Sequence, residues 1–402
     1  MNKRPFIILS AFLLLFSLIE KGQATETYRP ETSVAGFIQL PGSGRQVYNF
    51  NPGWRFFRGD VRGAEVVNFD DRSWNVVSTP HTVELMPAEG SGCRNYQGPA
   101  WYRKHFVLPA ETKGQRVVLH FEAAMGKQIL YLNGKRIQEH LGGYLPFTLD
   151  LTANGVQAGD SCLLAVFTDN SDDKSYPPGK RQYTLDFAYH GGIYRDVWMI
   201  AKSPVAITDA IDSQTVGGGG VFIHFDKISE KSAQVYVNTE VQNDDARSES
   251  VTVETTLTDA DGKVIKRSSG KLSLKPGEKK SICQQMEVKN PTLWSPDTPY
   301  LYRVQSRIKK GNKSIDGGIT RVGIRLAEFR GKDGFWLNGK PFGQLVGANR
   351  HQDFAYVGNA LPNSQQWRDA KRLRDAGCTI IRVAHYPQDP AFMAVSYTHL
   401  TL

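Results

Sequence analysis

Two histidines near the C-terminal end of the sequence each follow a largely apolar run. His351 ends the segment 347–351 (Gly-Ala-Asn-Arg-His), which comes after the run 342–346, and His385 follows the run 378–384. From its position alone, each of these two residues would be interpreted as an ordinary surface or core histidine without a binding role. Here, however, both imidazoles come directly after a predicted strand, where they can donate hydrogen bonds to the hydroxyl groups of a ligand. We therefore take His351 and His385 as candidate binding residues.

The residues between the two runs predict a helix at positions 363–376. Its apolar face is formed by Trp367, Ala370 and Leu373. Asn363 and Gln366 have the spacing of a capping box, and Gly377 suits the position after the last turn. A strand, a helix and a second strand form the opening unit of a (β/α)₈ barrel, whose active site lies at the C-terminal ends of its strands.

Arg382 lies in the second predicted strand, on the same side as Ile380 and Ala384. If this side faces the inside of a barrel, the guanidinium needs a carboxylate partner, because an unpaired buried charge costs several kcal/mol. The sequence before Arg382 offers no obvious partner.

The region before the barrel unit is rich in short predicted strands. Runs at 116–121, 127–132 and 162–167 are punctuated by glycine, proline and the turn dipeptide Asn133-Gly134, which predicts a β-sandwich of jelly-roll type. A second unit begins near residue 204, and about seven strands in roughly 120 residues are typical of an immunoglobulin-like sandwich. The expected fold class is therefore multidomain and mainly β, ending in the first β-α-β unit of a TIM barrel.

At these residues the chain resembles the family 2 glycoside hydrolases, most closely the β-galactosidase-like branch. The segments 347–351 and 382–387 (Arg-Val-Ala-His-Tyr-Pro) are similar to those that mark the first two barrel strands of that family. Four earlier segments resemble its N-terminal sugar-binding domain, namely 98–104, 133–135, 142–147 and 191–197.

The resemblance implies roles for five residues. His351, His385 and Asn349 would bind the terminal sugar, and Arg382 would support the catalytic nucleophile. Asp169 resembles a position from which family members reach into the barrel to bind sugar or a monovalent ion, although an ordinary turn aspartate is an equal alternative. No cofactor can be assigned, and the resemblance leaves a divalent or monovalent cation open.

Catalysis with retention needs two carboxyl groups about 5 to 5.5 Å apart. The family pattern places both glutamates on later barrel strands, and a complete barrel takes about 250 residues. The acids after Gly334 lie in predicted loops or on the helix and match no catalytic motif: Asp353, Asp369, Asp375 and Asp389. We therefore expect both catalytic glutamates to lie beyond this chain, which should be inactive alone.

The expected domain organisation has five parts. Residues 1–24 have a basic start, an apolar stretch of fourteen residues and small residues at cleavage spacing, as in a secretory signal peptide. A single-pass anchor is the alternative, but the stretch falls short of the roughly 20 residues that span a bilayer. The jelly-roll domain covers 25–203, the immunoglobulin-like sandwich 204–326 and the incomplete barrel 327–394. Residues 395–402 depart from the family pattern, and we interpret them as a non-native tail.

Composition narrows the possible partners. The chain has 402 residues and a formal net charge of +9, with 40% hydrophobic and 22% charged residues, which is ordinary for a globular protein. The basic residues are scattered among acids without a stripe of interleaved aromatics, which argues against nucleic-acid binding. The four cysteines lack the spacing of a zinc site or a disulfide framework.

We expect the full-length protein to be a secreted, retaining exo-β-glycosidase in the bacterial periplasm, acting on a carbohydrate substrate as a β-galactosidase. It would have no membrane anchor after signal cleavage. The sequence is compatible with both a monomer and an oligomer. The alternatives are a β-glucuronidase of the same family and a non-catalytic carbohydrate-binding protein.

Overall fold

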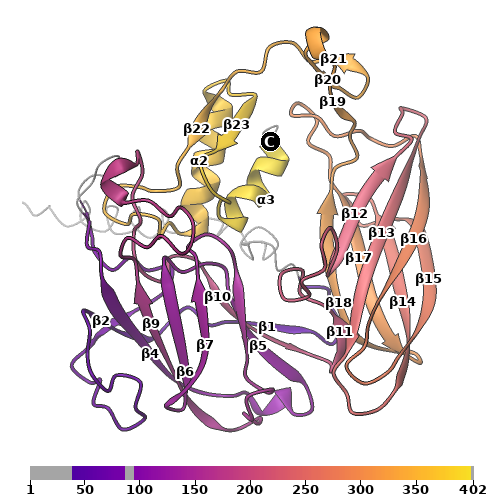
Figure 1. Cartoon of the computed structure of the whole chain (residues 1–402). Coiled ribbons are helices and arrows are strands. Elements are labelled where there is room, and N and C mark those ends of the chain that lie inside the picture. The colour runs from indigo at the N-terminus through magenta and orange to yellow at the C-terminus, as the bar shows by residue number, and fades with distance from the viewer. Residues whose placement is uncertain (1–38, 87–94, 400–402) are drawn as a thin grey trace, which may run out of the picture.

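The computed structural model describes residues 39–86 and 95–399 (Figure 1). It shows two β-sandwiches followed by a β-α-β unit and a last helix, so the predicted fold class is confirmed. The predicted signal peptide lies outside the described residues. Among the described helices, none combines the length and apolar character needed to cross a membrane.

The first sandwich consists of a four-stranded and a six-stranded sheet. The four-stranded sheet has the order β1 (Gln46–Asn49), β10 (Val197–Lys202), β5 (Arg116–Phe121) and β8 (Phe147–Asp150). The six-stranded sheet has the order β3 (Asn75–Val77), β2 (Trp54–Arg58), β4 (Pro99–Val107), β9 (Ser161–Asp169), β6 (Lys127–Leu132) and β7 (Lys135–Leu141). One core lies between them and includes Trp54, Tyr102, Leu119 and Phe121. It is built by inward-facing residues that alternate along the strands.

The predicted turn at Asn133 and Gly134 is confirmed. Both residues have positive φ angles, 51° and 82°, and they connect β6 to β7. A two-residue hairpin connection with both φ angles positive matches the twist of the flanking strands. Two short 3-10 helices complete this sandwich, η2 (Ala110–Thr112) and η3 (Gln182–Thr184).

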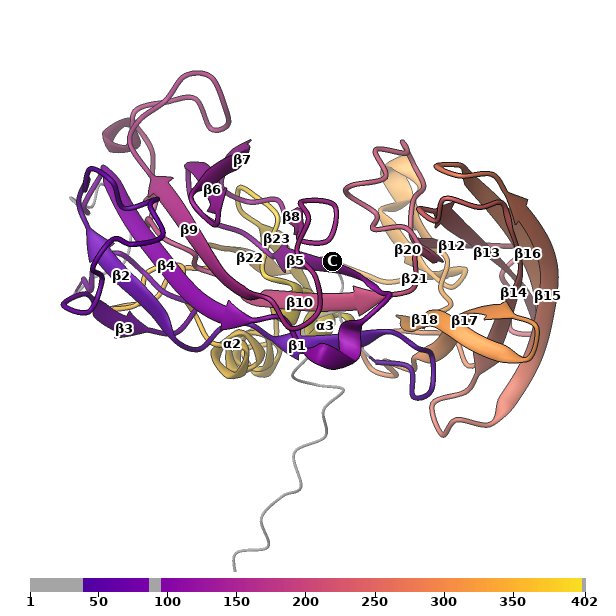
Figure 2. The same ribbon diagram turned by 90° about the horizontal axis from the view of Figure 1, so that it is seen from below.

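The second sandwich consists of two four-stranded sheets. One contains β11 (Val205–Ile207), β13 (Ser232–Asn243), β12 (Val221–Asp226) and β16 (Lys279–Lys289). The other contains β15 (Val264–Leu274), β14 (Glu249–Thr258), β17 (Tyr302–Lys310) and β18 (Lys313–Val322). In β13, Ala233, Val235 and Val237 alternate inward and are fully buried in the core. Figure 2 shows this sandwich beside the first one.

A small three-stranded antiparallel sheet leads from the second sandwich to the barrel unit. It comprises β19 (Ala327–Phe329), η4 (Gly331–Asp333), β20 (Phe335–Leu337) and β21 (Lys340–Pro341). The barrel unit comprises β22 (Gly347–Arg350), α2 (Asn363–Asp375), β23 (Ile380–Val383) and α3 (Pro390–His399). It lies over one end of the first sandwich (Figure 1).

The first barrel strand starts later than the sequence predicts. β22 begins at Gly347 and not within 342–346, and it pairs in parallel with β23 so that Gly347 faces Ile380. A Cβ atom on Gly347 would lie 1.7 Å from the carbonyl oxygen of Ile380. The two backbones therefore approach too closely for any side chain here, and this glycine begins the strand pair.

The predicted helix is confirmed, but its predicted capping box is wrong. Pro362 occupies the N-cap position without a side-chain cap, and Asn363 is the first helical residue. The Asn363 amide instead donates to Asp196, and Gln366 accepts from Arg350. Asn363 and Gln366, which the local pattern assigns to the cap, therefore form hydrogen bonds with residues outside the helix instead.

Helices α2 and α3 cover one face of the strand pair. Ala370, Ile381, Phe392 and Val395 form a small buried core between them. Tyr397 also belongs to α3, and its carbonyl oxygen accepts from the Trp294 indole at 2.7 Å. The structure thus places the first residues of the predicted tail against the second sandwich, while their non-native origin stays a prediction.

Candidate functional site

The two candidate histidines lie side by side. Arg350 pairs with Val383 at the ends of the parallel strands, and the histidines follow these ends. The ring centroids of His351 and His385 are 5.3 Å apart, with the rings nearly perpendicular. The sequence correctly places both on one rim, because parallel strands end at the same edge of a sheet.

A loop of the first sandwich completes this rim. The carboxylate Oδ1 of Asp186 lies 4.0 Å from Nε2 of His385. The ring of Phe187 packs against both imidazoles, with centroid distances of 5.5 Å to His351 and 5.8 Å to His385. The sequence does not single out these two residues, because a short loop carries no signal of the partner it meets. The sequence feature that could have directed attention to Asp186 and Phe187 is the family-like segment that follows them at 191–197.

Two stacked tyrosines lie next to the histidines, and one of them contacts His351. The rings of Tyr144 and Tyr386 stack in parallel, with centroids 4.3 Å apart. The Tyr386 hydroxyl lies 3.4 Å from Nδ1 of His351 and also contacts the backbone nitrogen of Gln352. Burial raises the pKa of Tyr386, so the hydroxyl stays neutral.

Arg195 connects the first sandwich to both histidine segments. Its buried guanidinium donates to Oε1 of Gln352 at 2.9 Å and to the carbonyl of Pro387 at 2.7 Å. Asp389 lies 3.9 Å from it, and burial raises the pKa of this carboxyl group. Gln352 and Pro387 follow His351 and His385 in the chain, so this arginine fixes both segments relative to the sandwich.

A second buried pair lies behind His351. Asp353 is 3.8 Å from Nε2 of His190, and both side chains are almost fully buried. Burial alone would raise the pKa of Asp353, but the contact with His190 outweighs it and lowers the pKa. This pair ties the loop after β22 to the same sandwich loop that carries Asp186.

Arg382 and Asn349 lie opposite each other on the open face of the strand pair. They are register partners, and the guanidinium lies 3.4 Å from the Asn349 amide oxygen. Both are exposed, because α2 and α3 cover the other face. Within residues 39–86 and 95–399, no carboxylate forms an ion pair with Arg382. Its proposed support of a nucleophile stays a prediction.

Asp169 ends β9 and makes a local turn. Its carboxylate accepts from the backbone nitrogen of Ser171 at 2.8 Å. No described contact joins it to the histidines, whereas Asp186 of the same sandwich meets His385. The role predicted for Asp169 stays a prediction, and Asp186 is the acid that the structure brings to the site.

The four acids after Gly334 all have structural partners. Asp353 meets His190 and Asp389 meets Arg195, as described above. Asp369 accepts from Arg350 at 2.8 Å, and Asp375 forms an exposed pair with Lys371 on α2. Hydrolysis with retention needs two carboxyl groups that face the same sugar. Within the described part of the chain, none of these four carboxylates forms such a pair beside the histidines.

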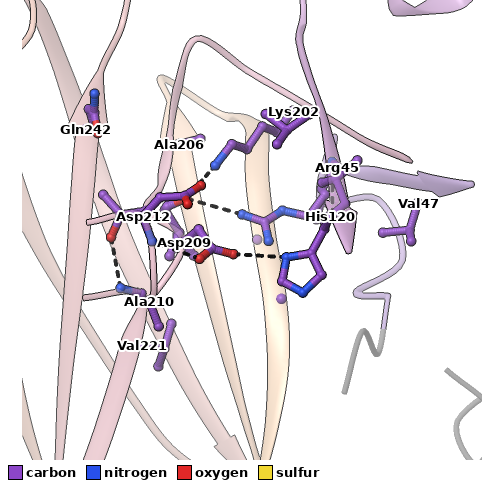
Figure 3. A pocket seen from close by; sticks show the side chains of 18 of the residues that line it. Arg45, Val47, His120, Lys202, Ala206, Asp209, Ala210, Asp212, Val221 and Gln242 are labelled. Carbon is purple, nitrogen blue, oxygen red and sulfur yellow. Dashed lines mark hydrogen bonds and ion pairs between the residues drawn. The ribbon is translucent and has the colours of Figure 1, made fainter. Parts of the chain in front are cut away.

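A separate cavity of about 430 Å³ lies between the two sandwiches (Figure 3). Its walls carry ion pairs, including Arg45 with the fully buried Asp316 at 2.8 Å and His120 with Asp209 at 3.5 Å. Burial lowers the pKa of Lys202 in the same wall to about 8. The charges in these walls face one another across the junction, and none of the residues that line the cavity belongs to the barrel unit.

The rim therefore offers two imidazoles and one carboxylate against an aromatic wall. Such groups can exchange hydrogen bonds with sugar hydroxyls, and they are also potential metal ligands. The nearest ligand atoms of Asp186, His351 and His385 all lie within 4.8 Å of one another.

Comparison with known proteins agrees with this architecture. Three models of the glycosyl hydrolases family 2 match the chain in order: the sugar binding domain at residues 66–204, the family 2 domain at 219–325 and the TIM barrel domain at 329–399. Together they cover most of both sandwiches and the barrel unit.

Curated relatives and solved structures agree with the family models. A β-galactosidase of Thermoanaerobacter pseudethanolicus is 34% identical over 87% of this chain, and a β-glucuronidase of Formosa agariphila is 32% identical over 88%. The crystal structure of a Bacteroides uniformis β-glucuronidase superposes with a TM-score of 0.81 at 32% identity, over 89% of this chain and 41% of that one. The chain spans 45% and 37% of the two curated relatives' lengths. This chain therefore belongs to glycosyl hydrolase family 2.

Proposed function

We propose that the full-length protein is a retaining exo-β-glycosidase that removes a terminal sugar from a glycan. The observation that carries the proposal is the meeting of His351, His385 and Asp186 at the ends of the first two barrel strands. These groups suit the binding of sugar hydroxyls, including contacts that strengthen as oxocarbenium character develops.

A β-galactoside is the proposed substrate. The three rim groups whose ligand atoms lie close together are two imidazoles and a carboxylate, and none of these three is a permanent cation. A glucuronide carries a carboxylate that needs basic or amide partners, which these three groups do not supply, whereas Arg382 and Asn349 on the adjoining strands are groups of that kind. Relatives of both kinds match the chain, so a β-glucuronidase is the second candidate.

The chain by itself should bind sugar weakly and hydrolyse nothing. Its described acids near the barrel unit are engaged in ion pairs with His190, Arg195, Arg350 and Lys371. In this proposal the two catalytic glutamates come from later barrel strands. The proposed location is the periplasm, which rests on the signal-like segment 1–24.

A panel of nitrophenyl glycosides tests the proposal. The full-length gene product should hydrolyse the β-galactoside and release the sugar with its β configuration retained, while the 402-residue chain should show no turnover. Preference for the β-glucuronide would select the second candidate. Activity only on α-glycosides, or sugar binding without hydrolysis by the full-length product, would overturn the proposed function.

A further inference from the structure

We infer that Asp186, His351 and His385 form a binding site for a divalent transition metal of the Zn²⁺ class. The three residues come from two domains, and their ligand atoms lie within 4.8 Å of one another. Two imidazoles with one carboxylate are the donor set that zinc and its neighbours in the first transition row prefer.

The ligand spacing suits a site that contracts slightly on binding. Metal–ligand bonds of about 2.0 to 2.2 Å in a tetrahedral site put ligand atoms roughly 3.3 Å apart. Oδ1 of Asp186 is 4.0 Å from Nε2 of His385, so a shift of less than about 1 Å brings this pair to that spacing. The Asp186 side chain is 71% exposed, and that of His385 is 33% exposed. Both can therefore move this far without unpacking the core.

The surroundings of His351 favour metal ligation. The Tyr386 hydroxyl lies 3.4 Å from Nδ1, where it can accept a hydrogen bond and leave Nε2 free of its proton. Metal-binding histidines usually donate their other ring N–H in this way. Phe187 packs against both imidazoles and restricts their orientation. Three protein ligands leave a further coordination position for water.

Titration with Co²⁺ tests the site directly, because Co²⁺ replaces Zn²⁺ and its ligand-field absorption reports the donor set. The 402-residue chain, purified without a polyhistidine tag, should bind one equivalent, and Zn²⁺ should displace it. Asp186→Asn and His385→Asn should each weaken binding at least tenfold. Asp186→Asn is the decisive variant, because an exposed carboxylate can be replaced without loss of folding.

His224→Asn is the matched control. His224 is an exposed histidine on β12 of the second sandwich, and its loss should leave the affinity unchanged. Absence of one-equivalent binding would overturn the inference. So would an Asp186→Asn affinity equal to that of the unmodified chain, or a His224→Asn loss as large as that of the His385 variant.

One consequence rests on the proposed function: the metal and a terminal sugar should exclude each other. Added β-galactoside should raise the apparent dissociation constant for Co²⁺, and Zn²⁺ should inhibit the full-length product competitively. Binding of Co²⁺ that depends on Asp186 but ignores the sugar would uphold the metal site and contradict the sugar pocket. If the sugar competes with Co²⁺ but Asp186→Asn has no effect on Co²⁺ binding, the sugar pocket is upheld and the metal site at Asp186 is contradicted.

Discussion

The rings of Tyr144 and Tyr386 stack in parallel at 4.3 Å, and this contact joins the first sandwich to the segment that carries His385. The two residues come from different domains. The stack places the Tyr386 hydroxyl against His351, so one aromatic contact positions groups on both barrel strands. The relative positions of the rim residues thus depend on the sandwich as much as on the strands.

Replacing Tyr386 by phenylalanine should lower kcat/KM of the full-length product about fivefold. The stack would remain, and the hydrogen bond that orients His351 would be lost, which is worth about 1 kcal/mol. Steady-state kinetics on the preferred nitrophenyl glycoside measures the change. Tyr236→Phe, on β13 in the second sandwich, is the control and should have wild-type kinetics. An unchanged kcat/KM in the Tyr386 variant would show that this hydroxyl has no positioning role.

Replacing His385 by asparagine should cost the full-length product roughly 100-fold or more in kcat/KM, as loss of a transition-state hydrogen-bond donor does. The loss should fall mainly on kcat if the contact strengthens in the transition state, and on KM if the histidine binds ground and transition states equally. His224→Asn serves as the control here too. A His385 variant with less than a twofold effect would remove this residue from the sugar site.

Gly347→Ala should disrupt the strand pair. The new methyl group would lie 1.7 Å from the Ile380 carbonyl oxygen, so β22 and β23 must separate. We expect loss of amide-exchange protection in β22, β23 and α2, with both sandwiches unaffected. Gly318→Ala, on β18, is the matched control, since a Cβ atom there has no neighbour within 4 Å. Retention of protection in the Gly347 variant would contradict the close backbone approach.

Asp196 should make the first sandwich and its contact with α2 sensitive to pH. Burial raises the pKa of this carboxyl group from 3.8 to about 6, against the hydrogen bond from Asn363. The folded state therefore holds the proton more tightly than the unfolded state. Its contribution to stability is complete below pH 3.8 and is lost as the pH rises through about 6. The shift corresponds to at most about 3 kcal/mol.

Urea unfolding between pH 4 and 7 tests this prediction. The wild-type midpoint should fall over this range relative to that of Asp196→Asn, which carries no charge. Burial also raises the pKa of Glu122 and Asp389 nearby, so part of the pH dependence should remain in the variant. Asp375→Asn, at the exposed end of α2, is the control. Parallel wild-type and Asp196→Asn curves would refute the assignment.

The sequence by itself determined the elements and their order. The runs 116–121 and 127–132 predicted strands of the first sandwich, the Asn133-Gly134 turn fixed a hairpin, and the run 378–384 led to His385. These features are local, because strand and helix periodicity and turn chemistry depend on neighbouring residues. The common rim of His351 and His385 also follows from local pattern plus the rule that parallel strands end at one edge.

Only the tertiary structure decided which groups meet across domains. It brought Asp186 and Phe187 to the histidines, gave Arg350 and Asp196 the side chains that resembled a capping box, and placed the start of β22 at Gly347. Such contacts join residues far apart in the sequence, and their energies depend on burial and packing that a local pattern does not contain. A loop aspartate and a close backbone approach become informative only when the opposing chain is in place.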